Sequence, residues 1–416
     1  MGAFLIGRLP TSAGAVQVPV PDPNAEAVRW LGAEQSLPLE FFWREGLQME
    51  SADKVIQVRL GAGMQYDNLF LMSQDEKLKS AVGIIRDGSE FRRARFQISG
   101  VLQDFYEFKA EYDFSGGETT IQDLYIGFRN LPGFGVLRFG NQKEPLGLDE
   151  LTSDYSLTFL EQPLPSALAP SRNPGLLAAN CFLDKRLTAS AGLFREGNSA
   201  GDAREREKLH VTLRLTGLPW RQAFDRLLHL GASYYRRAPD DGAVEFNIAP
   251  ETRLAPFFVS IGPLPTDVVE IVNLESALVF GRFSMHGEYL STRTESKDLS
   301  DFRFAGYYIQ SSLFLTQDHR PYLSEQGIFG GVLPSQPFHP SKSGWGAWEA
   351  AVRYSFLDLK DKDQAGATVG NEIWNLTAAL NWYWTPNLRL QLDFIHGDLK
   401  DVGAADMAST RLQLEF

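Results

Sequence analysis

The chain has 416 residues, a formal net charge of −12 and a mean hydropathy of −0.20. No apolar run approaches the roughly 20 residues that a membrane-spanning helix needs, so a helical membrane protein is excluded. The acidic balance argues against a broad basic surface for nucleic acid. The single cysteine, Cys181, permits no internal disulfide and no cysteine-rich metal site.

The first part of the chain, residues 1–38, is rich in Pro, Ala and Val and shows no sustained period. It is interpreted as an extended or periplasmic segment, or alternatively as a disordered tail. Residues 4–7 are too few for the apolar region of a signal peptide, so we expect that a signal was removed or that the start is incomplete. Phe41 to Met49 is predicted to form a short strand before the main body.

From Lys54 onward, polar and apolar residues alternate along the chain. In the clearest case, Arg93 and Arg95 alternate with Ala94 and Phe96. A period of two gives each strand one polar and one apolar face. The segments are about 9–11 residues long, which is the length that a tilted membrane strand needs.

The number of these segments predicts a closed barrel. We expect an all-β fold, a transmembrane antiparallel β-barrel of about 16 strands that occupies residues 39–416. An even number is typical of bacterial barrels. The strands are predicted to begin near residues 54, 91, 106, 120, 135, 185, 208, 228, 243, 268, 282, 301, 344, 371, 387 and 409.

Connection lengths predict the orientation. If both chain ends lie in the periplasm, the tight connections at residues 103–105, 131–133 and 385–387 fall on the periplasmic side, and the long connection 144–184 falls outside. The long connection 317–343 falls on the periplasmic side and fits this pattern poorly.

An ordered set of short blocks resembles the phosphate-selective porin O and P family. The blocks include Phe91–Phe96, Gly140–Ser153, Phe314–Tyr322 and Leu380–Asn387. The resemblance implies a sixteen-stranded, usually trimeric outer-membrane porin of a Gram-negative-type bacterium that passes small anions such as phosphate. It also implies that the third outer loop, here 144–184, folds into the lumen as a constriction loop, and that the connection 317–343 folds inward as well.

This loop departs from the anion-selective members of the family because it is acidic. Gln162 also stands where relatives often have arginine. Against the single arginine Arg172, the loop carries the carboxylates Glu144, Asp149, Glu150, Asp154 and Glu161, among others.

Cations on the polar faces are the candidate anion path, because a pore that passes anions presents arginine and lysine at close quarters. The competing interpretation is that they pair with the nearby carboxylates Glu107, Glu111, Asp113 and Asp123. Lys143 and Arg172 flank the third loop and either line the constriction or tie the loop to the wall. Pro170 and Pro174 suggest a fixed turn, which favours the tie for Arg172. The candidate residues are Arg59, Arg93, Arg95, Lys109, Arg138, Lys143, Arg172, Arg186 and Arg214.

The sequence gives little support for catalysis. It has no HExxH, GxSxG or GxxxxGK[ST] motif, so we predict no enzyme activity, no cofactor and no metal site. The expected partners are outer-membrane lipid and lipopolysaccharide, small anions and two further copies of the chain, with no nucleic acid. Two rival hypotheses stay open: a structural or adhesive barrel whose lumen is plugged by its own loops, and a soluble β-sandwich.

The outward faces at strand ends carry tryptophans. Trp348, Trp374, Trp382 and Trp384 are interpreted as an aromatic belt at the membrane interface. The last residue, Phe416, resembles the C-terminal assembly signal of outer-membrane barrels.

Overall fold

The computed structural model describes residues 39–416 apart from 45, 202–207, 240–241, 297–300, 342 and 364. The predicted N-terminal segment 1–38 lies outside the described residues. None of the helices among them is long and apolar enough to cross a membrane. The strands are β1 Leu39–Trp43, β2 Leu47–Ser51, β3 Ile56–Gln74, β4 Gly88–Leu102, β5 Tyr106–Asp113, β6 Thr120–Leu131, β7 Gly135–Lys143, β8 Arg172–Phe182, β9 Leu187–Phe194, β10 His210–Ala223, β11 Arg226–Arg237, β12 Ala243–Ile248, β13 Val259–Pro265, β14 Val268–Phe280, β15 Phe283–Glu295, β16 Phe302–Phe314, β17 Tyr322–Leu323, β18 Ile328–Phe329, β19 Ala347–Asp358, β20 Asp361–Lys362, β21 Thr368–Val369, β22 Glu372–Tyr383, β23 Leu388–Leu399 and β24 Gly403–Glu415. The helices are α1 Glu76–Val82, α2 Leu148–Leu151 and the 3₁₀ turns Ser115–Gly117 and Leu164–Leu168.

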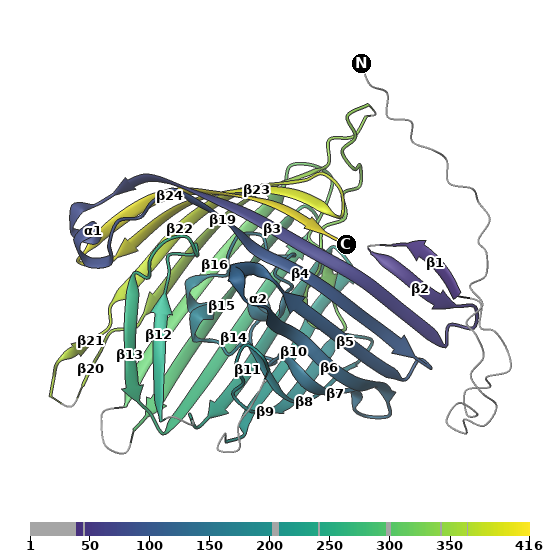
Figure 1. Ribbon diagram of the computed structural model, residues 1–416, viewed down its shortest axis with the longest axis horizontal. Coiled ribbons are helices and arrows are strands. Elements are labelled where there is room, and N and C mark those ends of the chain that lie inside the picture. Colours follow the sequence, from purple (N-terminus) through teal and green to yellow (C-terminus); the bar gives the residue numbers. More distant parts are fainter. Residues whose placement is uncertain are drawn as a thin grey trace.

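The strands form one closed antiparallel barrel. Sixteen of the described strands pair in sequence order, and the last of them, β24, pairs with the first, β3. Figure 1 shows the tilted strands wrapping around a common axis, with α1 at one end and the C-terminus at the other. The predicted all-β, sixteen-stranded barrel is confirmed.

The predicted number of sixteen is correct because two errors in the strand assignment cancel: one predicted strand is not in the barrel, and one strand of the barrel was missed. The predicted strand near residue 243 is not in the barrel: β12 pairs with β13 as a separate hairpin within an outer connection. The missed strand is β8, which occupies residues assigned to the loop 144–184. Pro174 suggested a turn there, but it lies opposite Asn141 of β7, so the connection is shorter, residues 144–171.

A hairpin at the start of the described chain extends the seam of the barrel. β1 pairs with β2, and β2 pairs with the first residues of β3, where β24 has already ended. Phe416 exchanges two backbone hydrogen bonds of 2.9 Å with Ala62 and contacts the ring of Trp43 at 5.2 Å. The predicted single strand around 41–49 is therefore two strands, and the barrel itself begins at Ile56 rather than at residue 39.

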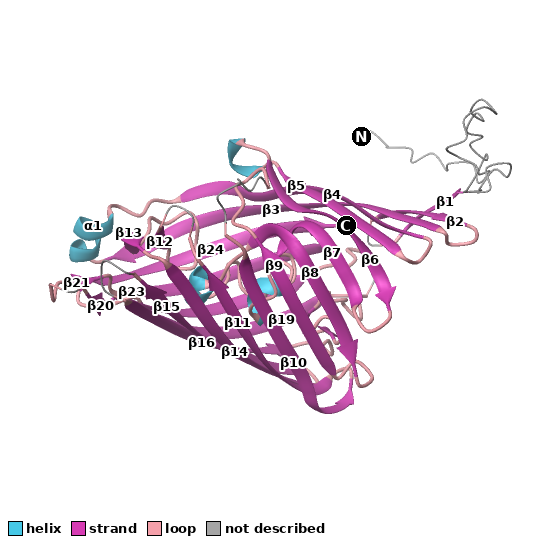
Figure 2. Ribbon diagram, turned by 90° about the horizontal axis from the view of Figure 1, so that it is seen from below, coloured by secondary structure: helices cyan, strands magenta, loops and turns pink. Residues whose placement is uncertain are grey.

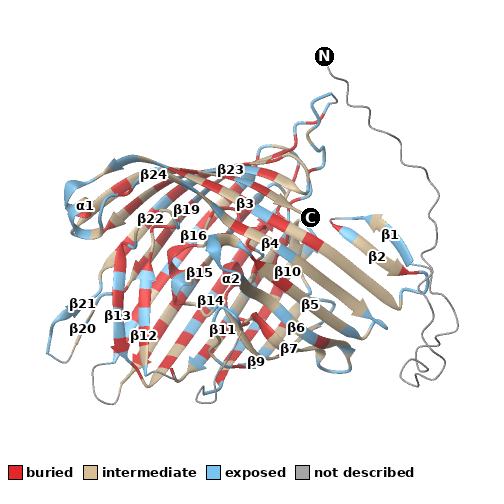
Figure 3. Cartoon of the chain, in the orientation of Figure 1, coloured by how far each residue is buried: buried red, intermediate tan, exposed pale blue. Residues whose placement is uncertain are grey.

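The two faces of the strands differ in the way that the alternation predicts. On β22, Asn375 and Thr377 are fully buried inside the barrel, whereas Leu376 between them is 45% exposed. Figure 3 shows this alternation of buried and exposed positions along the strands. A soluble sandwich would bury its apolar faces against each other, so that hypothesis is wrong.

Aromatic rings gather on the outer face at both ends of the wall formed by β16, β19 and β22. At the end that holds the C-terminus, Trp348 stacks on Trp382 at 4.8 Å, and Trp384 lies edge-on to Trp382. Toward the other end, Tyr354 stacks on Trp374 at 6.0 Å. This placement is typical of interfacial girdles.

The outer end of the barrel carries an apolar core on one side. The hairpin β12–β13 lies at the same end as α1 (Figures 1 and 2). Its buried face packs with the outer ends of β14 to β16 and with strands near the C-terminus. We call this set the outer apolar cluster; it includes Leu146, Leu164, Leu168, Val244, Phe246, Ile248, Val259, Ile261, Ile271, Phe302, Phe304, Leu357, Ile373, Ile395 and Met407.

Candidate pore and its charged lining

A polar cavity of about 700 Å³ lies beside the outer ends of β4, β5 and β6. The connections that follow β5 and β7 complete its wall. We call it the charged cavity, because six cations and four carboxylates line it. These are Arg92, Arg93, Arg95, Lys143, Arg172, Arg253, Asp113, Glu118, Glu150 and Asp154.

A β-bulge in β4 brings consecutive arginines to this cavity. Gln65 pairs with Arg93, but the next residue of β3, Tyr66, pairs with Phe91, so Arg92 is the extra residue. A bulge re-aims side chains locally. Phe91 therefore keeps its outward position, while both Arg92 and Arg93 line the cavity.

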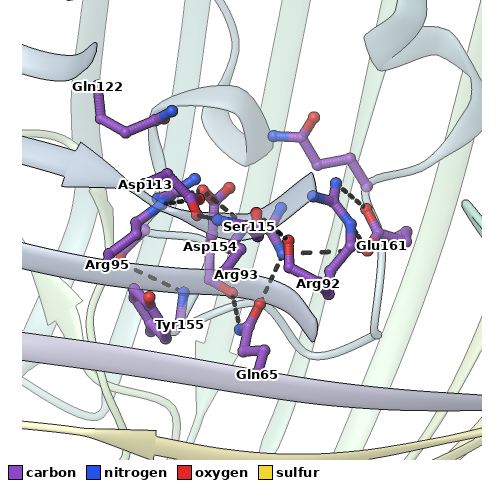
Figure 4. Close-up of polar contacts among 12 residues, drawn as sticks. Gln65, Arg92, Arg93, Arg95, Asp113, Ser115, Gln122, Asp154, Tyr155 and Glu161 are labelled. Carbon is purple, nitrogen blue, oxygen red and sulfur yellow. Dashed lines mark hydrogen bonds and ion pairs between the residues drawn. The ribbon is translucent and has the colours of Figure 1, made fainter. Parts of the chain in front are cut away.

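Asp154 lies between Arg93 and Arg95 (Figure 4). Its Oδ2 is 2.8 Å from a terminal nitrogen of Arg95 and 3.2 Å from Nε of Arg93. Arg95 also donates to Asp113 at 2.9 Å, and Arg93 donates to Gln65 at 2.7 Å. These side chains are nearly buried, so their charges interact with little screening.

Lys109 and Arg172 share the carboxylate of Asp123. Their nitrogens are 2.7 Å and 2.8 Å from its two oxygens, and Lys109 also contacts Glu111 at 2.6 Å. Further along the same wall, Arg138 contacts Glu107 at 2.6 Å. Each of the four carboxylates named above therefore pairs with a cation, and the cations that pair with them are Arg95, Lys109, Arg138 and Arg172.

Lys143 joins the end of β7 to the connection that follows it. Its ammonium donates to the carbonyls of Glu150 and Thr152, and it lies 3.9 Å from the Glu150 carboxylate. Of the two residues that flank the connection, Lys143 ties it to the wall directly, whereas Arg172 holds Asp123 of the wall. Both also line the charged cavity.

Five of the nine predicted residues do not line the charged cavity. Two of them, Lys109 and Arg138, are held by the carboxylates of the wall described above. Arg59 lies near the start of β3, opposite Gln48 of the hairpin. Arg186 was expected on the polar face of a strand, but it lies exposed in the turn before β9 and donates to the carbonyl of Arg221. Arg214 is buried on β10, where it pairs with Glu275 at 2.8 Å and donates to the carbonyls of Gln326 and Gly327.

The connection 144–171 is fixed by side chains from the inner faces of distant strands and from the connection that follows β16. Within 144–171, the carbonyls of residues 154–158, 160 and 161 each accept a side-chain hydrogen bond. A row of buried donors on one backbone stretch satisfies groups that burial would otherwise leave unpaired. In chain order of the acceptors, the donors are Gln65, Gln413, Arg320, Arg389, Asn381 with Gln391, Arg411 and Arg353.

Glu161 is a second carboxylate of this connection that holds several guanidiniums. Arg92 binds it through two hydrogen bonds of 2.8 and 3.0 Å, and Arg411 contacts it at 2.8 Å while also binding Asp67. Arg93 lies 3.9 Å away. Glu161 and Asp154 therefore neutralise much of the positive charge on β4 and β24.

These contacts also set the protonation of both carboxyl groups. Burial alone would raise the pKa of Asp154, but the neighbouring Arg93, Lys143 and Arg95 outweigh it and hold that pKa well below its usual range. Burial opposes ionisation of Glu161 as well, and Arg92, Arg93 and Arg411 lower its pKa in the same way. Both groups are ionised at neutral pH.

The long connection between β16 and β19 contacts the same interior. Arg320 donates to the carbonyl of Ser156, and Phe329 packs against His286 of β15 at 4.8 Å. Leu148 of α2 belongs to one buried apolar cluster with Ile328 and Phe329. Two connections that start at opposite ends of the barrel therefore meet.

Several residues of the site were missed by reading the sequence. Arg92 broke the alternation, since it adjoins Arg93, and two adjacent charges in a strand are the signal of a bulge. Arg353, Arg389 and Arg411 lie on polar faces, but nothing in their spacing indicated that they hold residues 157–161. Among the described residues, no group of three or more His, Cys, Asp or Glu side chains is placed to hold a metal ion.

A closed barrel with an apolar outer face and a charged cavity inside defines a membrane channel of the porin class. The family model described as phosphate-selective porin O and P matches residues 58–416. The chain belongs to this family, and it is an outer-membrane porin of a Gram-negative-type bacterium.

Curated proteins and solved structures agree with this assignment. Porin O of Pseudomonas aeruginosa is 24% identical over 383 residues, covering 84% of this chain and 85% of its own. An uncharacterized protein of Caulobacter vibrioides is 26% identical, covering 98% and 84%. OmpT of Vibrio cholerae in its trimer form has a TM-score of 0.55 at 12% identity, covering 87% of this chain and 100% of its own. The anion-selective porin of Comamonas acidovorans has a TM-score of 0.52 at 12% identity with the same coverage. These two structures support the fold.

Proposed function

We propose that the protein is a passive diffusion channel for small anions such as phosphate, and that the charged cavity is the outer part of the path. The observation that carries this proposal is the excess of cations in its lining, six against four carboxylates. Arginine forks suit the oxygens of phosphate and similar anions. No catalysis and no cofactor are involved, because the concentration gradient drives the flow.

The connection 144–171 is proposed to act as the constriction. Its carbonyls accept hydrogen bonds from inward-facing side chains of β3, β19, β22, β23 and β24, which supports a segment folded into the lumen. The connection 317–343 is proposed to fold inward from the periplasmic end, since Arg320 reaches Ser156. Together they leave the side of the barrel near β4 to β6 as the route.

We further propose a homotrimer embedded among outer-membrane lipid and lipopolysaccharide. The solved Vibrio cholerae OmpT includes a trimer form, and the Comamonas acidovorans porin is anion-selective.

Conductance in planar bilayers tests the channel. The full-length protein is reconstituted between unequal KCl concentrations, and the reversal potential is read. We expect discrete open channels with a reversal potential that favours chloride. A potential that favours potassium would contradict the anion path.

The meeting of the two connections also favours a second candidate, a barrel plugged by its own loops. Leu148, Ile328 and Phe329 pack into one buried cluster where the two connections meet. A plugged barrel predicts no steps of current above the bare bilayer, whereas the channel predicts steps. The same recording therefore separates the two functions.

A further inference from the structure

Asp154 occupies the place where the charged cavity would hold an anion. Its carboxylate accepts from Arg95 at 2.8 Å and lies 3.2 Å from Nε of Arg93. Its side chain is about one-twelfth exposed, and it lines the cavity together with Lys143 and Arg172. Figure 4 shows the carboxylate directed between the two arginines of β4.

The backbone around Asp154 holds this carboxylate in place. Gln65 donates to the carbonyl of Asp154 at 3.2 Å, and Gln413 donates to that of Tyr155 at 2.9 Å. The Tyr155 ring lies 5.9 Å from the Arg95 guanidinium. The carboxylate therefore has a high local concentration at the arginines, because its own chain tethers it there.

We propose that Arg93 and Arg95 form an oxyanion-binding site that the protein itself occupies with Asp154, and that this tethered carboxylate sets the selectivity of the pore. The inference rests on the proposed anion path. A carboxylate and a phosphate present similar oxygen pairs to a guanidinium. A free oxyanion must therefore displace Asp154 to bind, and the wild-type channel holds oxyanions weakly.

Replacement of the carboxylate unmasks the site. In Asp154→Asn, the side chain keeps its size but loses its charge, so the guanidiniums are left to a permeating anion. Arg95 retains Asp113 and Glu111, and Arg93 retains Gln65, so both side chains keep partners that orient them.

The test is block of chloride current by inorganic phosphate in bilayers holding the full-length protein. We expect the half-blocking phosphate concentration of Asp154→Asn to be about tenfold lower than that of the wild type, with a reversal potential further toward chloride. Glu118→Gln is the matched control. It removes the same charge from the same cavity, and among the residues that the structure describes Glu118 forms no ion pair. We expect it to move the reversal potential slightly and the half-blocking concentration by less than about twofold.

Equal effects of Asp154→Asn and Glu118→Gln would overturn the inference, because they would show a general change of cavity charge. If Asp154→Asn does not assemble, a measurement on the wild type alone still tests the inference. The tethered carboxylate predicts half-block by phosphate only above about 10 mM, and half-block below about 0.1 mM would overturn it. A sealed or potassium-selective wild type would instead overturn the proposed function.

Discussion

The two sides of the barrel's outer mouth are built from opposite chemistry. On the side of β14 to β24, the outer apolar cluster packs the β12–β13 hairpin against the wall. On the side of β4 to β6, charged groups surround an open cavity. The loops, rather than the wall, therefore determine the route of the solute. The inner face of the wall is polar all round, but loops fill one side of the mouth and leave the other side open to solute.

The largest expected effect is on stability, and it comes from the ion pairs that join the connection 144–171 to the wall. Arg411→Met removes a fully buried guanidinium from Asp67 and Glu161 and from the carbonyl of Leu160. Breaking such a buried pair costs about 3–5 kcal/mol, because the remaining carboxylates lose their partner. Thermal unfolding of the purified protein, followed by the shift of its band on gels, measures the loss.

Lys400→Met is the control for this variant. Lys400 contacts Glu372 from an exposed position, so we expect an unchanged midpoint of unfolding. An equal fall of the unfolding midpoint in both variants would show that the buried ion pairs of Arg411 stabilise the protein no more than the exposed pair of Lys400.

The next effect concerns the charged side itself. Arg95→Gln removes one cation from the cavity, and one unit charge at about 4 Å in water contributes about 1 kcal/mol. We expect the ratio of chloride to potassium permeability to fall about fivefold, measured by the reversal potential. Arg293→Gln, which removes an arginine paired with Asp301 on the outer face, should leave that ratio as it was; a fall there would point to membrane surface charge.

A smaller effect, on conductance, is expected from the apolar side of the mouth. Replacing Ala243–Pro265 by a short Gly-Ser linker removes the β12–β13 hairpin and opens the filled half of the mouth. Conductance should rise about twofold, while the reversal potential shifts only slightly toward potassium, because the segment carries one of the six cavity cations, Arg253. A large shift of the reversal potential would mean that the hairpin positions the charged cavity as well.

The smallest effect is the response to mild acid. Asp154 and Glu161 have pKa values in the folded protein below their usual range, so their stabilising contribution is complete above about pH 4, the usual value for free carboxyls. It is lost only as the pH falls through those lowered values. Reversal potential and thermal midpoint should therefore stay level from pH 7 to about pH 5; a transition within that range would show that these carboxyls are not held by the arginines.

The sequence by itself determined the barrel and which face of each strand is polar. These follow from a local rule, since the side-chain period of a strand is two. The same rule gave wrong assignments where a segment alternates but is not a strand of the barrel, or is a strand of the barrel but was assigned to a loop. The alternating residues 243–248 form one strand of a separate hairpin outside the barrel sheet, and Pro174, which suggested a turn, lies within β8.

Only the tertiary structure decided which cation meets which carboxylate. Arg411 and Asp67 are 344 residues apart, yet ring closure places them side by side on β24 and β3. Arg93 and Arg95 were selected from their alternation and from the arginine-rich block that resembles the family, but Asp154 reaches them because a loop 59 residues further on is fixed by donors from distant strands. Closure of the sheet and the path of its loops bring these charges together, and a period of two carries no information about either.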